Sequence, residues 1–217
     1  MRFFCVQTTF ILIAVTAFIS FSPVAANAQS AKDSLNSSSG ISSGISSANS
    51  VESATSLKQK RLDDLFGSLA NEAKAPSAKR ISDKIWDEWL DSGSKSIDLL
   101  MSQARKAVGT QKEGFALDVL DQVITLAPEF AEGWNFRATV HYKKKDFGRS
   151  LADIEQTLKL EPRHFGALAG LAAILNQLGK QEKALQTWQK VLEIYPANAA
   201  AQKEVIRLVE ATFGEKV

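Results

Sequence analysis

The chain has almost no cysteine and little histidine. Cys5 is the only cysteine among 217 residues, and His141 and His164 are the only histidines. Because Cys5 precedes the first apolar run, we expect a processed protein without cysteine. That expectation excludes disulfides, thiolate catalysis and cysteine-ligated metals. A domain of this size does not need disulfides, since it can bury an adequate core.

An excess of one charge is also lacking. The chain has 26 Lys and Arg against 24 Asp and Glu, a formal net charge of +2. A nucleic-acid-binding domain shows a dense positive patch, so we expect no nucleic-acid partner. Hydrophobic residues make up 45% of the chain and charged residues 23%, as in soluble globular proteins. The length allows one or two domains.

The first 28 residues form a segment of their own. Arg2 is followed by an apolar run over residues 10–21, which is shorter than the about 20 residues that a membrane-spanning helix needs. Ala26-Asn27-Ala28 has the small-x-small pattern of a signal cleavage site. We predict a signal peptide over residues 1–28, cleavage after Ala28, and a periplasmic or exported protein that is not inserted in the membrane after cleavage. The single charge before the apolar run leaves an uncleaved anchor as the alternative.

Residues 29–56 are rich in serine. Twelve of these 28 residues are serine and none is aromatic, so the segment cannot bury enough apolar area to offset its ordering entropy. We expect a disordered linker. A spacer that holds the domain away from a membrane or wall and a plain leader are both open.

From Leu57 onward the apolar residues recur at helical spacing. No alternating strand pattern of useful length follows, so we expect an all-α body. Two apolar stripes precede residue 97, the first formed by Leu62, Leu65, Phe66 and Leu69, the second by Ile81, Ile85, Trp86, Trp89 and Leu90.

A 34-residue repeat then determines the architecture. Pro128, Pro162 and Pro196 stand 34 residues apart and define blocks 97–130, 131–164 and 165–198. Several columns match without insertion, among them Ala104, Ala138 and Ala172, and Ala116, Ser150 and Ala184. Each block is predicted to be two antiparallel helices, packed closely at the small residues and ended by the proline. Stacking the blocks makes one continuous core.

Two further segments complete the expected stack. Residues 57–96 fit the repeat register poorly, and we expect a degenerate helix pair that caps the N-terminal end. Residues 199–217 carry an apolar stripe with Lys and Glu opposite, which is typical of a C-terminal capping helix.

The repeat resembles the tetratricopeptide repeat (TPR). The second block carries the resemblance best, through Trp134, Ala138, Tyr142, Phe147, Ser150, Ile154 and Pro162. The resemblance implies a right-handed α-solenoid of antiparallel helix pairs with three TPR units. With the leader, the chain resembles exported TPR proteins of Gram-negative, alphaproteobacterial-like cell envelopes. It implies a scaffold or adaptor, not an enzyme, with no cofactor, which binds a protein or peptide segment in its concave groove.

The first helices of successive units line that groove in the family. The resemblance therefore implies groove positions at Met101, Arg105, Asn135, Phe136, Thr139, Tyr142, Lys143, Asn176 and Gln177, with Ala169 and Ala173 in the third block. The third groove helix has an unusually small-residue face, "FGALAGLAA". It admits either tight helix packing, which we favour, or a close approach of a ligand backbone. One subset of the family clamps a partner's C-terminal carboxylate with lysine and asparagine. That pairing is missing here, so we do not expect chaperone-tail binding.

The histidines are the remaining chemical candidates. His164 lies in the joint "EPRHF" between blocks two and three, where we expect a ring nitrogen to satisfy a helix end. His141 shares a column with Ala107 and Leu175, which predicts a buried histidine between helices. Two histidines without cysteine make a poor zinc set, and we expect no metal. Self-assembly into a homo-oligomer is an alternative function, and an envelope enzyme or metal binder that uses His141 or His164 is a minor one.

Overall fold

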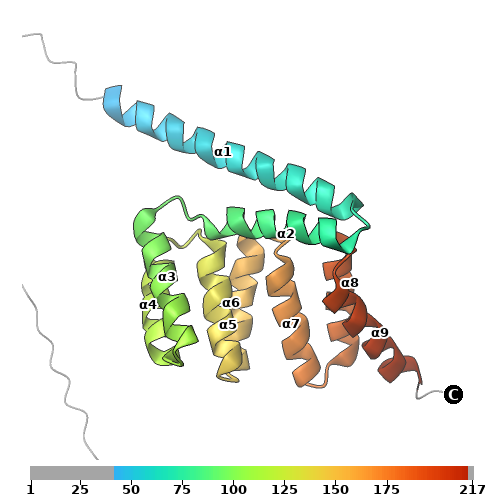
Figure 1. Cartoon of the computed structure of the whole chain (residues 1–217). Coiled ribbons are helices and arrows are strands. Elements are labelled where there is room, and N and C mark those ends of the chain that lie inside the picture. The colour runs from blue at the N-terminus through green and yellow to red at the C-terminus, as the bar shows by residue number, and fades with distance from the viewer. Residues whose placement is uncertain (1–41, 215–217) are drawn as a thin grey trace, which may run out of the picture. The chain divides into compact units, whose positions relative to one another are not determined.

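The protein is helical throughout its described part. The computed structural model describes residues 42–214, and these form nine α-helices and no strand (Figure 1). This confirms the prediction of an all-α helical-repeat solenoid. None of these nine helices is long and apolar enough to cross a membrane. The predicted signal peptide, residues 1–28, lies outside the described residues. The helices are α1 (Ser42–Asn71), α2 (Ala75–Leu90), α3 (Lys95–Gly109), α4 (Glu113–Leu126), α5 (Ala131–Lys143), α6 (Phe147–Leu160), α7 (Phe165–Gln177), α8 (Gln181–Ile194) and α9 (Ala199–Phe213).

The three prolines end the second helix of each block. Helices α4, α6 and α8 each stop two residues before Pro128, Pro162 or Pro196. The residue before each proline leaves the helical conformation, because the proline ring disfavours it there. These residues are Ala127, Glu161 and Tyr195, with φ of −138°, −136° and −133°. One backbone joint is therefore repeated at the end of each block.

Small residues let the two helices of a block approach closely. Ala104 and Ala116 in α3 and α4, and Ala172 and Ala184 in α7 and α8, are fully buried. In the second block Ser150 replaces the alanine. Its Oγ donates a hydrogen bond to the carbonyl oxygen of Ala138 at 2.8 Å, so the extra polar group is satisfied.

The first two helices do not continue the stack as the sequence suggested. A helix pair is present in residues 57–96, but α2 runs across the ends of the repeat helices instead of lying parallel to them (Figure 1). The apolar residues of α1 and α2 pack against residues near the joints, and this packing directs α2 across the helix ends. Ile85 and Trp89 of α2, with Leu62, Phe66 and Leu69 of α1, share a core with Phe165, Leu168, Val191 and Tyr195 near the joints. We call α1 and α2 the hairpin.

Helix α1 also begins earlier than expected. Residues 42–56, which we had assigned to the disordered linker, are helical, while residues 29–41 lie outside the described part. A helix that is anchored at Leu62, Phe66 and Leu69 extends at low cost, since each added residue brings one more hydrogen bond. The high serine content of residues 29–56 had led us to predict a disordered linker instead of a helix.

The joint at His164 binds α2. The His164 ring is fully buried and stacks on the Trp89 indole, with centroids 4.0 Å apart and planes 8° apart. Its Nδ1 accepts the Ala167 backbone N–H at 3.0 Å, which confirms that a ring nitrogen caps the next helix. The ring proton is therefore on Nε2, 3.2 Å from the Glu132 carboxylate. One side chain thus ties together α2, α5 and α7.

The neighbouring residue binds α1. Arg163 Nη1 lies 2.7 Å from Asp63 Oδ1, and its guanidinium lies over the Phe66 ring, 4.2 Å from the centroid. Glu161 binds the same guanidinium, with its Oε1 3.0 Å from Arg163 Nε. The other two joints have no arginine or histidine at these positions. The suggestive "EPRHF" cluster is thus the attachment point of the hairpin.

Gly166 sets how closely the hairpin can approach. A Cβ there would lie 2.8 Å from Trp86 Cη2, and Trp86 is packed edge-on against Trp89 and His164. We expect Gly166→Ala to lower the free energy of unfolding by about 1–3 kcal/mol, because the added methyl group would push the Trp86 ring out of its contacts with Trp89 and His164. Urea denaturation followed by circular dichroism measures this change.

Gly67→Ala is the matched control. A Cβ at this position in α1 meets nothing within 4 Å, so the variant should gain about 0.5–1 kcal/mol from helix propensity. Equal effects of the two variants would contradict the packing described at Trp86.

Candidate functional site

A small cavity lies between the first helices of the second and third blocks. Its volume is 170 Å³, and it is lined by Asn135, Ala138, Thr139 and Tyr142 of α5, Ser150 and Ile154 of α6, and Gly166, Ala167 and Gly170 of α7. Small-molecule sites measure about 300–1,000 Å³, so this one matches a single side chain. We call it the groove cavity.

The polar side chains of the groove cavity are held by local hydrogen bonds. Asn135 Nδ2 donates to Glu132 Oε2 at 2.9 Å, and Thr139 Oγ1 donates to the Asn135 carbonyl oxygen at 3.0 Å. Tyr142 leans on the Phe147 ring at 5.8 Å between centroids. These contacts fix the α5 wall before any ligand arrives, which lowers the ordering cost of binding.

The α7 wall is almost bare backbone. Gly166 and Gly170 contribute no side chain, and Ala167 is buried. A Cβ at Gly170 would lie 3.5 Å from Ile154 Cδ1, in ordinary contact, so the glycine leaves room for a ligand without being required by packing. In the sequence, this wall corresponds to the small-residue stretch "FGALAGLAA", which we had attributed to tight helix packing.

The structure brings together only some of the expected groove residues. Asn135, Thr139 and Tyr142 line the groove cavity, whereas Ala138, Ser150 and Ile154, which also line it, were not among the expected residues. Met101 is a correction: it is 1% exposed and belongs to the core of the first block, so it offers no groove surface. The remaining expected residues do not line the cavity. Phe136 packs against the first block's core, Asn176 is half-buried, and Arg105, Lys143 and Gln177 are exposed.

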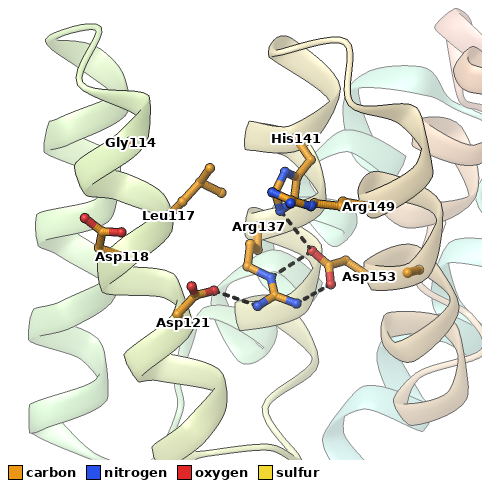
Figure 2. Close-up of a pocket in the computed structure, with 9 residues that line it drawn as sticks. Gly114, Leu117, Asp118, Asp121, Arg137, His141, Arg149 and Asp153 are labelled. Atoms are coloured by element: carbon orange, nitrogen blue, oxygen red, sulfur yellow. Dashed lines mark hydrogen bonds and ion pairs between the residues drawn. The ribbon is translucent and has the colours of Figure 1, made fainter. Parts of the chain in front are cut away.

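A second, larger cavity lies between α4, α5 and α6 (Figure 2). It measures 540 Å³, and Arg137 occupies its centre. The Arg137 guanidinium forms two hydrogen bonds with Asp153, of 2.9 and 2.6 Å, and a third with Asp121, of 2.7 Å. The hydrogen bonds to Asp153 raise the pKa of Arg137 above its usual range despite burial.

His141 borders the same cavity. It is 5% exposed, as predicted for a histidine between helices, and its Nε2 lies 3.9 Å from Asp153 Oδ2. Burial lowers the pKa of His141 below its usual range, against the opposing pull of Asp153 and Asp146. Burial therefore favours the neutral form of the ring.

This arrangement ties two blocks together. Arg137 joins Asp121 of the first block to Asp153 of the second, so the charges are largely paired inside the protein. Within residues 42–214, no group of three or more His, Cys, Asp or Glu is placed to hold a metal ion. His141 and His164 belong to separate clusters, at Asp153 and at Trp89 respectively.

Comparison with known proteins defines the class. No family model matches the chain. A TPR repeat-containing protein of Rhizobium etli is 44% identical over 163 residues, covering 75% of this chain and 80% of that protein. The chain therefore belongs to the TPR repeat-containing proteins. The small glutamine-rich TPR-containing protein 2 of Saccharomyces cerevisiae is 26% identical over 145 residues, which cover 65% of this chain and 42% of the yeast protein.

Solved structures share the fold. The first TPR of Spaghetti, bound to an HSP90 peptide, has a TM-score of 0.52 at 23% identity and covers 55% of this chain and 94% of its own. A MamA double mutant has a TM-score of 0.51 at 19% identity, over 55% of this chain and 67% of its own. What these relatives share with the chain is the TPR repeat.

The Arg137 cluster yields a stability prediction. Asp153 is 3% exposed, so Arg137→Met would leave a buried carboxylate unpaired. We expect a loss of about 3 kcal/mol in the free energy of unfolding, measured by urea denaturation. Asp121→Asn is the control, because the Asp121 side chain is 62% exposed and its loss should cost under about 1 kcal/mol.

A double variant tests the cause. Arg137→Met combined with Asp153→Asn should recover part of the loss, since it removes the unpaired charge. Arg137→Met as mild as Asp121→Asn would show that the pair contributes nothing.

Proposed function

We propose that the chain is a non-enzymatic scaffold of the cell envelope that binds a protein or peptide segment in the groove cavity. The observation that carries the proposal is the cavity itself. It lies between the first helices of two successive repeats, it has room for one side chain, and one of its walls is bare backbone. An extended segment can place its main chain against Gly170 and insert one apolar side chain toward Ile154.

The comparisons support peptide binding as the class of function. The Spaghetti TPR is bound to an HSP90 peptide, and the TPR2B domain of yeast Sti1, with a TM-score of 0.50, is in a complex with pHsp70. This chain lacks the lysine and asparagine pairing of chaperone-tail binders. The two positions hold Met101 and Arg105 in the first block and Asn135 and Thr139 in the second. The segment that fits is therefore apolar at one residue and without extreme charge.

In-cell photocrosslinking tests the groove. A photoreactive residue at Tyr142 should give a discrete adduct with another protein, whereas one at the exposed Lys190 of α8 should not. Gly170→Leu fills the groove cavity and should abolish the Tyr142 adduct at unchanged melting temperature.

Gly148→Leu is the control, because a Cβ there meets only Asp146 Oδ1, at 4.0 Å. An adduct that survives Gly170→Leu, or that contains only a second copy of this chain, would overturn the proposal. The second result would favour self-assembly instead.

The export proposal rests on the sequence of residues 1–28 and has its own test. We expect the mature protein, isolated from the periplasmic fraction, to begin at Gln29 when its N-terminus is sequenced. Replacing Ala26 and Ala28 by bulky residues should retain the leader, because the cleavage pattern requires small side chains. A full-length protein in the cytoplasmic fraction would contradict export.

A further inference from the structure

The first repeat has an uncovered end. Within the described residues, α5 packs on one side of the α3–α4 pair, and the hairpin lies across the joints, so no helix stacks on the pair's outer side (Figure 1). Three large apolar side chains of this pair are exposed: Leu99 by 60%, Phe115 by 54% and Leu126 by 66%. We call this surface the open end. It is separate from the groove cavity, which involves α5, α6 and α7.

The open end is hollow and positively charged. A cavity of 330 Å³ is lined by Gln103, Lys106, Ala107, Thr110, Lys112 and Phe115. Both charged residues of this lining are lysines. Among the described side chains, neither Lys106 nor Lys112 forms an ion pair with a carboxylate, whereas Arg137 and Arg163 each bind two. The surface thus combines exposed apolar area with unneutralised positive charge.

We propose that the open end binds an amphipathic helix of a partner protein whose apolar stripe is flanked by acidic residues. A helix is the matching shape, because each later boundary in the array is already filled by one: α5 on the first pair, α7 on the second and α9 on the third. The apolar stripe covers Leu99, Phe115 and Leu126, and the acidic residues pair with Lys106 and Lys112.

A second copy of this chain fits the open end less well. Two open ends placed face to face would oppose lysine to lysine, which is repulsive. The other end of the array, α9, exposes Ile206 and Val209, but its charges are balanced and Arg207 is already paired with Glu204 at 2.9 Å. Among the described carboxylates of α9, only the exposed Glu210 forms no ion pair, so this helix would offer one acidic group to two lysines.

Fluorescence anisotropy with the full chain and two synthetic probes tests the proposal. One probe is a helical peptide of about 18 residues with leucine at i, i+3, i+4 and i+7 flanked by glutamate, and the other replaces each glutamate by lysine. We expect the acidic probe to bind. The double variant Lys106→Glu, Lys112→Glu should weaken it about tenfold and improve binding of the basic probe.

Lys183→Glu with Lys190→Glu is the matched control, since both are exposed on α8 and change the net charge equally. Its affinity should stay unchanged, as should that of Gly170→Leu, which fills only the groove cavity. Phe115→Ser should weaken binding without changing the molar mass in light scattering.

Four results would overturn the proposal. The first is that the unchanged chain binds neither probe, and the second is that the control pair weakens binding as much as the variant at Lys106 and Lys112. Loss of binding in Gly170→Leu would place the probe in the groove cavity instead. A dimer that Phe115→Ser dissociates would show that a second copy covers the open end.

Discussion

The stacking of His164 on Trp89 is the interaction on which the arrangement of this protein depends. The ring lies at the joint between the second and third repeats, where one nitrogen caps α7 and the other faces Glu132 of α5. Its face is left for the Trp89 indole, 4.0 Å away. Because both edges of the imidazole are held by the repeats, its orientation is fixed before the hairpin docks. His164, a residue type often found in catalytic sites, thus connects α2, α5 and α7.

The hairpin packs across the joints and does not stack on the first repeat, and this position determines which surfaces remain for binding. If α1 and α2 had stacked on α3 and α4, they would have covered the outer side of that pair. Instead they cover Phe165, Tyr195 and their neighbours at the helix ends. The concave side keeps its small cavity between α5 and α7, and the Arg137 cluster fills the space between α4 and α6 with paired charge. The two binding surfaces that we propose therefore lie on different repeats.

Sequence reasoning works here where the repeat enforces the answer. The 34-residue spacing of the prolines locates the joints, and the aligned alanines locate the close helix contacts, because both are local and recur. It fails for the hairpin, since the contact of Arg163 with Asp63 spans 100 residues and has no counterpart in other repeats. In the groove, Asn135, Thr139 and Tyr142 followed from the resemblance to the TPR family. The sequence shows Gly166 and Gly170 only as small residues. A small residue is equally consistent with tight helix packing and with a cavity wall, so the wall could not be predicted.

The hairpin has a consequence for the order in which the chain folds. Each repeat contacts mainly its neighbours, so the array can form progressively as the chain is synthesised. The hairpin is made first, yet Trp86 and Trp89 dock on residues that leave the ribosome much later. Until the third repeat exists, Trp86 and Trp89 contact only the hairpin and lack their partners His164 and Phe165. The nascent chain therefore carries exposed apolar surface for most of its synthesis, and closure of the hairpin is its last long-range step.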